Sequence, residues 1–411
     1  MPRWWRVAST RFRALVAREA SSLRQGFVAL LVSTSASLLA GLTLGAITGT
    51  LEDLPGLLVL VPAVLALRGN VGGALASRLG TAIHAGTFRR SWRIDSLVGQ
   101  NLAAAAVLSL GLSFVFALLA KAAAIAFGVP DTISVVDFVV ISVVGGAVAS
   151  VVVIGITVVM ANASARRGWD LDNVAAPIVT AAGDLVTLPS IWLAAHLVDL
   201  GWFTGAVGAV CAAAAVAAVV SGMRTSMATL RGIVRQSLPI LAVAGLVSVA
   251  AGVSIEKRLE SFIAFPALLM LIPPFLATAG AIGGIFSSRL ATKLHLGLID
   301  PSRFRLLAVA EDMFLVVLFA FPVFLAVGVV ADILGAAVGL ASPGAIEMVE
   351  IALIAGVLAT ASLVVIGYLG TVTAYRFGLD PDNYAIPVVT SSLDLLGAFS
   401  VIFALVAVGV A

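Results

Sequence analysis

Eleven long apolar runs decide what this chain can fold into. The hydrocarbon core of a bilayer is about 30 Å thick, and a helix needs roughly 20 apolar residues to cross it. Runs of about that length recur along the sequence without the strict alternation of barrel strands. We therefore predict an all-α polytopic protein of the cell membrane, with eleven transmembrane helices near residues 27–50, 55–80, 96–128, 137–163, 174–198, 202–223, 238–254, 262–290, 306–333, 346–375 and 384–410.

The composition excludes several classes of protein. Hydrophobic residues make up 61% of the chain and charged residues 11%, whereas a soluble domain has about 45–50% and about 25%. The single cysteine, Cys211, excludes a disulfide framework and a cysteine zinc cluster. We expect the lipid bilayer as a partner, no nucleic acid and no resident cofactor. No nucleophile and base cluster at one depth, so we do not expect an enzyme.

The distribution of Lys and Arg predicts the orientation. Eighteen of them fall in the N-terminal arm and in alternate connections, whereas the opposite set of connections holds only Lys257 and Arg258. Cytoplasmic loops carry the excess of positive charge, so we predict a cytoplasmic N-terminus and a C-terminus outside. The outer connections hold eight acidic residues. They form either a face that concentrates cations or ordinary solvated loops.

The sequence repeats itself in two blocks. Residues 55–86 match residues 266–297 at an offset of 211, with 16 of 32 positions identical. Residues 170–184 match residues 380–394 at an offset of 210, with 8 of 15 identical. Because the blocks keep their order and separation, we infer an internal duplication.

The duplication sets the domain organisation that we expect. Residues 1–26 form a cytoplasmic basic arm, residues 27–200 the first repeat, residues 201–236 a linking transmembrane helix with its loop, and residues 237–411 the second repeat. The linking helix restores the orientation of the second repeat, so the halves are parallel about a pseudo-two-fold axis along the membrane normal. The chain is then a pseudo-dimer that requires no further oligomerisation.

Asp184 and Asp394 are the strongest candidates for an ion site. Each lies about 12 residues into its predicted helix, roughly 18 Å along it, and a carboxylate near mid-membrane is a functional hypothesis by default. Thr180 and Thr390 lie one turn earlier on the same face. Hard oxygen ligands of this kind suit Mg²⁺ or Ca²⁺ rather than zinc or copper.

Two alternatives remain for these aspartates. Each could hydrogen-bond a neighbouring helix in a purely structural role, or the pair could carry protons. Prolines one turn before the threonines free backbone carbonyls, and Asp–Asn pairs at the helix starts either cap the helices or line a vestibule. These residues are Pro177, Pro387, Asp172, Asn173, Asp382 and Asn383.

The first repeated block is a span interrupted by glycines. The glycines permit either close helix packing or carbonyls that line a cavity; they are Gly69, Gly72, Gly73, Gly280, Gly283 and Gly284. Asn70 adds a polar group in the first copy, where the second has Ala281. Near the next span, Gln100 and Asn101 correspond to Glu311 and Asp312, a difference at the inner mouth or only a solvated helix start.

The two blocks resemble the MgtE magnesium transporter family and its relatives in solute carrier family 41. The resemblance rests on P-x(6)-G-x-x-G-G-x(3)-S-R-L from Pro62 and Pro273, and on D-x-D-N-x(3)-P-x-x-T-x(3)-D from Asp170 and Asp380. It implies a five-span unit used twice, with a cation path between the second and fifth spans and the fifth-span aspartate as central ligand. Bacterial members carry a soluble magnesium sensor before the pore, which we expect this chain to lack.

We therefore expect transport of Mg²⁺ or a similar divalent cation, as substrate, through a path at the repeat interface. The candidate metal ligands are Asp184, Asp394, Thr180, Thr390 and Asn70. The alternative is a proton- or sodium-coupled secondary transporter that uses the same aspartates as proton carriers.

Overall fold

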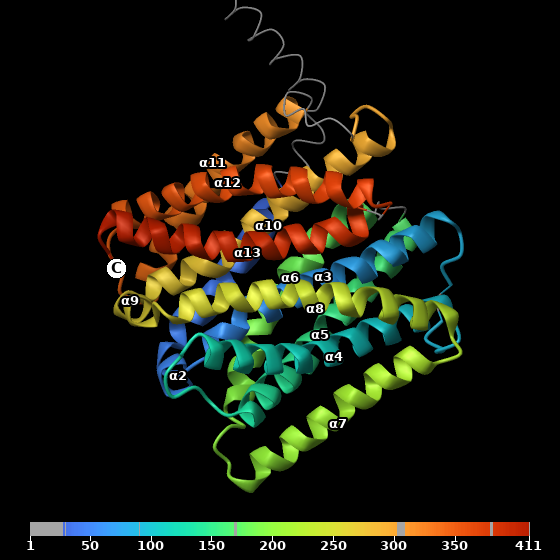
Figure 1. Ribbon diagram of the computed structural model, residues 1–411, viewed down its shortest axis with the longest axis horizontal. Helices are drawn as coiled ribbons and strands as arrows, with labels where there is room; N and C mark the ends of the chain where they lie inside the picture. Colours follow the sequence, from blue (N-terminus) through green and yellow to red (C-terminus); the bar gives the residue numbers. More distant parts are fainter. Residues whose placement is uncertain are drawn as a thin grey trace, which may run out of the picture.

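The computed structural model describes residues 28, 30–89, 91–167, 171–301, 309–378 and 381–410, and the regular secondary structure of these residues is helical (Figure 1). Ten of the described helices are long and apolar enough to cross a membrane, which confirms the polytopic all-α prediction. They are α3 (Leu57–His84), α4 (Leu97–Ala126), α5 (Val135–Arg167), α6 (Leu171–Ala195), α7 (Trp202–Arg224), α8 (Ala228–Glu256), α10 (Pro266–His295), α11 (Ala310–Ala337), α12 (Ala345–Arg376) and α13 (Pro381–Val408).

Three shorter helices complete the described part of the chain. The first predicted span is a 17-residue helix, Leu30–Ala46, which the one-and-a-half-turn helix α2 (Thr48–Asp53) follows. Helix α9 (Leu259–Ala264) lies between α8 and α10. The predicted arm, residues 1–26, lies outside the described residues.

Helix α8 begins at Ala228, ten residues before the predicted start of that span. The prediction followed the apolar run and treated the segment with Arg231 and Arg235 as a loop. In the structure, Leu230 and Val234 are buried against Ala104 of α4, and these two residues are four apart on one helix face. Tertiary packing therefore extends the helix past the end of the apolar run.

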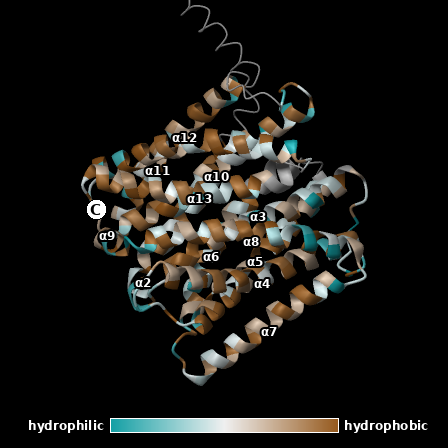
Figure 2. Cartoon of the chain, viewed as in Figure 1, coloured by the Kyte–Doolittle hydropathy of each residue, from teal (hydrophilic) through white to brown (hydrophobic). Residues whose placement is uncertain are grey.

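The two halves repeat the same packing arrangement. Helix α3 packs against α4, α5 and α6, and α10 packs against α11, α12 and α13 in the same order. Helices α5 and α6 are neighbours, as are α12 and α13. Hydrophobic residues cover the long helices, and hydrophilic residues gather toward their ends and connections (Figure 2).

The first helix of each half crosses to the other half. A Cβ added at Gly41 would overlap the carbonyl oxygen of Met270 on α10, and a Cβ added at Gly252 on α8 would overlap that of Val59 on α3. Gly41 and Gly252 are 211 residues apart, and so are Val59 and Met270, so the two contacts are equivalent. Helix Leu30–Ala46 therefore packs closely on α10, and α8 packs on α3, so close glycine contacts join the halves.

Helix α7 lies at the edge of the bundle, where it packs against α4, α5 and one end of α8 (Figure 1). Only 17% of its most apolar window is buried inside the protein, against 72% for α10. This peripheral position agrees with a linking helix, while the division of the chain at residues 200 and 237 stays a prediction.

Candidate functional site

A cavity of about 350 Å³ lies where the two halves meet. Both halves contribute equivalent helices to its wall: α3 and α6 from the first, α10 and α13 from the second, with the start of helix Leu30–Ala46. Its lining includes Leu30, Ser33, Pro62, Leu65, Ala66, Gly69, Asn70, Gly73, Thr180, Asp184, Pro273, Leu276, Ala277, Gly280, Ala281, Gly284, Ile285, Ile386, Thr390 and Asp394.

The structure brings the two candidate aspartates to this one cavity. Asp184 of α6 is buried, and its Oδ2 accepts a hydrogen bond from the Ser37 hydroxyl. Asp394 of α13 is half-buried, and its Oδ2 accepts a hydrogen bond of 2.7 Å from Ser248 Oγ of α8. Ser37 and Ser248 are 211 residues apart, so the first helix of each half donates to the aspartate of its own half.

These hydrogen bonds bear on the structural alternative for the aspartates. Each carboxylate does contact a neighbouring helix, as that alternative predicted. A carboxylate has about four lone-pair sites, however, and one serine hydroxyl occupies one of them. Because both carboxylates also line the cavity, each combines an interhelical hydrogen bond with a place in the cavity wall.

Ser37 and Ser248 are the site residues that the sequence reasoning missed. The first repeated block begins at residue 55, after the first span of the first half. Extended backward at the same offset, it pairs Ser37 with Ser248, Ala40 with Ala251 and Gly41 with Gly252. That signal was available in the sequence, although it does not say that the serines meet the aspartates.

The other candidate ligands also line the cavity. Thr180 and Thr390 come from the aspartate helices, and Asn70 comes from α3. The Thr390 hydroxyl donates to the Pro387 carbonyl at 3.1 Å, so a side chain of the same helix already engages that carbonyl. The side chains of Pro177, Asp172, Asn173, Asp382 and Asn383 lie outside the described part of the structure.

The six candidate glycines divide into two groups. Gly69, Gly73, Gly280 and Gly284 line the cavity. Gly72 and Gly283 are absent from its lining and face a neighbouring helix instead. A Cβ added at Gly72 would meet Val179 Cγ1 at 2.6 Å, and one added at Gly283 would overlap the Leu393 side chain. These two glycines let the second helix of each half pack tightly on the fifth, which is the packing alternative of the sequence analysis.

The starts of α4 and α11 are equivalent positions in the two halves, but they carry different polar residues. Asp312 is 1% exposed and forms ion pairs with Arg289, at 2.9 Å, and with Lys293. It is therefore buried, which excludes a solvated helix start for this residue. Its counterpart Asn101 is also buried. Arg78 is the counterpart of Arg289, and its Nε and Nη2 are buried without a hydrogen-bond partner in the described structure.

The described residues contain no cluster of three or more His, Cys, Asp or Glu. A site in the cavity would therefore combine two carboxylates with neutral oxygens from Thr180, Thr390 and Asn70. Oxygen donors of this kind suit Mg²⁺, which usually keeps several of its waters and takes one or two carboxylates.

The sequence profile of the MgtE family, described as a divalent cation transporter, matches residues 61–194 and 272–404. Solute carrier family 41 member 3 of Mus musculus is 26% identical over 390 residues, covering 84% of this chain and 74% of the relative. The Rattus norvegicus member 3 is 24% identical over 420 residues, covering 92% and 85%. Member 2 of Xenopus laevis is 33% identical over 156 residues, covering 36% of this chain and 26% of the relative, so the match spans about a quarter of that protein.

Proposed function

The chain belongs to the MgtE family of divalent cation transporters, a family of membrane transporters rather than enzymes, and from that premise we propose that it carries Mg²⁺ or a similar divalent cation across the membrane. The ion passes through the cavity between the repeats, with Asp184 and Asp394 as its charged ligands. The observation that carries this proposal is that two equivalent aspartates line one cavity.

The charge of the site supports a divalent substrate. Two carboxylates together compensate the charge of one divalent ion, and carboxylates inside a membrane are costly unless a partner balances them. Mg²⁺ sheds its water reluctantly, and a cavity of about 350 Å³ has room for an ion that keeps part of its water shell. Thr180, Thr390 and Asn70 then act as neutral oxygen ligands or bind the waters of the ion.

The serine hydrogen bonds support a fixed placement of the carboxylates. Ser37 and Ser248 hold one oxygen of each aspartate, so the remaining acceptor sites of each carboxylate are available to the ion. The predicted orientation adds an acidic outer surface that concentrates cations near the entrance. In this proposal the N-terminus is cytoplasmic and the C-terminus outside.

Transport in liposomes tests this proposal. The purified chain is reconstituted around a magnesium-sensitive dye, a magnesium gradient is imposed, and wild type is compared with Asp184→Asn/Asp394→Asn. In the double variant the ion has no charged ligand in the cavity, and loss of the partner of a buried charge costs about 2–5 kcal/mol, so we expect the rate to fall on the order of 100-fold. Elution volume and thermal unfolding establish that the variant is folded.

Glu52→Gln/Asp53→Asn is the matched control, because it removes two negative charges from exposed positions outside the cavity. It should keep most of the transport rate, because these two acids contribute only part of the outer charge that concentrates cations and no ligand to the cavity. Normal uptake by a folded Asp184→Asn/Asp394→Asn variant would refute the site assignment. Wild-type uptake that stops when the proton gradient is collapsed at fixed membrane potential would favour the proton-coupled alternative.

A further inference from the structure

Two surface grooves border α8 and α13, and neither shares a lining residue with the cavity. The first, of about 410 Å³, is here called the basic groove; its lining is Phe127, Ala250, Val253, Ser254, Lys257, Arg258, Leu395, Phe399 and Ile402. The second, of about 630 Å³, is called the neutral groove; its lining is Pro239, Ile240, Val243, Leu369, Gly370, Thr373, Ala374, Phe377, Ala385 and Val388.

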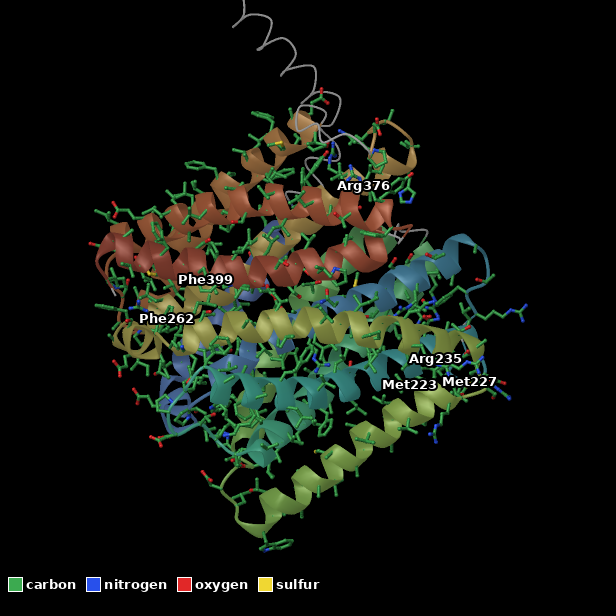
Figure 3. All side chains as sticks on the ribbon, in the orientation of Figure 1. Met223, Met227, Arg235, Phe262, Arg376 and Phe399 are labelled. Carbon is green, nitrogen blue, oxygen red and sulfur yellow. The ribbon has the colours of Figure 1, made fainter. Side chains whose placement is uncertain are left out.

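The helical period explains the apolar floor of the basic groove. Leu395, Phe399 and Ile402 are spaced four and three residues apart on α13, so they share one face of that helix. Ala250 and Val253 do the same on α8. Phe399, which is 50% exposed, is labelled on α13 in Figure 3. The floor is therefore an apolar trough at a surface that we expect to face lipid.

The rim of the basic groove carries two adjacent positive charges. Lys257 and Arg258 are exposed, and within the described residues neither side chain makes a hydrogen bond or an ion pair. The Lys257 ammonium lies 5.6 Å from the centre of the Phe127 ring, which holds it at the groove edge. Lys121, another base near this end, instead donates to the carbonyls of Thr132 and Ile133.

Two comparisons within the molecule set this rim apart. Lys257 and Arg258 are the two basic residues in the predicted outer connections, where acidic residues otherwise prevail. Their counterparts in the first half, 211 positions earlier, are the uncharged Ala46 and Ile47. The neutral groove borders the same two helices and has no charged residue in its lining.

We propose that the basic groove binds one anionic phospholipid, with its phosphate at Lys257 and Arg258 and an acyl chain along the floor. Guanidinium and ammonium groups form charge-assisted hydrogen bonds with phosphate, and each basic residue near an anionic lipid surface strengthens binding by roughly five-fold. The apolar floor matches an acyl chain. This ligand site is independent of the proposed ion path, and its binding can be measured without transport.

Fluorescence quenching by brominated lipid tests this proposal. The reporter Phe399→Trp, in the full chain, is reconstituted in phosphatidylcholine vesicles that contain either brominated phosphatidylglycerol or brominated phosphatidylcholine at equal mole fraction. The quenching beyond that of the parent protein measures occupancy of the groove. We expect the reporter to prefer phosphatidylglycerol by roughly ten- to thirty-fold.

Two further variants make the result decisive. Lys257→Gln/Arg258→Gln in the reporter background should abolish the preference, and Val243→Trp in the neutral groove should be quenched equally by both lipids. Equal quenching of a folded Phe399→Trp protein by the two lipids would overturn the proposal, as would a preference that survives the loss of both cations. Displacement of the brominated phosphatidylglycerol by inorganic phosphate would assign the cations to a free anion and also overturn it.

Discussion

The two halves keep the same aspartates and donor serines at the cavity but fill their cores differently. In the first half, Arg68 is fully buried and donates to the hydroxyls of Ser150 and, at 2.8 Å, Ser113. Its guanidinium lies against Gly146 of α5.

The second half fills the corresponding space with an aromatic ring. Ala279 stands at the position of Arg68, and Phe324, at the position of Ser113, packs against Gly356, the counterpart of Gly146. Phe324 also stacks with Phe275 at a centroid distance of 4.8 Å. One backbone arrangement therefore accepts either a hydrogen-bonded cation or an aromatic pair, because only the filled volume has to match.

The cavity follows the opposite pattern. The aspartates, the threonines and the serines that donate to the aspartates are identical in the two halves. The core therefore tolerates a change of chemistry, whereas the aspartates and the serines that donate to them repeat in residue type and in contact, although Asn70 in the cavity wall has Ala281 as its counterpart.

Substitutions at the two equivalent core positions, Arg68 and Ala279, should have very unequal effects on stability. Ala279→Arg places a guanidinium where Phe324 already fills the space, so overpacking and an unpaired buried charge should together cost more than about 3 kcal/mol and prevent folding. Arg68→Met replaces a buried cation with an apolar chain of similar length, and stability in detergent should stay unchanged or rise. Thermal unfolding and size-exclusion chromatography measure both. A folded Ala279→Arg protein would contradict this account of the two cores.

Glycine substitutions at the crossing helices should affect the halves equally. Gly41→Ala and Gly252→Ala each drive a Cβ into a backbone carbonyl of the opposite half, so each should destabilise the protein by about 1–3 kcal/mol. Elsewhere in a helix the same change stabilises by roughly 0.5–1 kcal/mol. Gly232→Ala is the control, because a Cβ there meets nothing within 4 Å. Unfolding temperatures that change for only one of the two glycines would show that the halves are not joined symmetrically.

Loss of the serine hydroxyls should have the smallest effect, on transport rather than on folding. Ser37→Ala and Ser248→Ala each remove one hydrogen bond to a carboxylate, which should lower the transport rate by roughly three- to ten-fold. The conservative replacements Ser37→Thr and Ser248→Thr keep the hydroxyl and should restore part of the rate. Dye uptake in liposomes is the measurement. Unchanged rates in both alanine variants would mean that the serines do not position the carboxylates.

Much of this architecture was predictable from the sequence. The length of the apolar runs determined the membrane-spanning class, since a bilayer admits a backbone only when its polar groups are satisfied within the segment. The offsets of 211 and 210 identified the duplication and paired Asp184 with Asp394. The same offset would have found Ser37 and Ser248, had it been extended to the first span.

The boundaries and the division of the glycines were less accessible. Hydropathy placed the start of α8 at residue 238, whereas packing on α4 starts it at Ala228. The glycine pattern is the same whether a glycine lines a cavity or packs on a helix. Gly69 faces the cavity and Gly72 faces Val179, a distinction that depends on which neighbour each helix face meets.

The membrane class, the duplication and the equivalence of residues between the halves follow from the amino-acid pattern alone. The packed helices add that the first helix of each half crosses to the other, that the serines donate to the aspartates, and that both aspartates reach one cavity. The physical reason is that a repeat fixes which positions correspond, while the partner of a helix face is decided by packing between helices distant in the chain. Gly41 against Met270 and Gly252 against Val59 are contacts that no local pattern specifies.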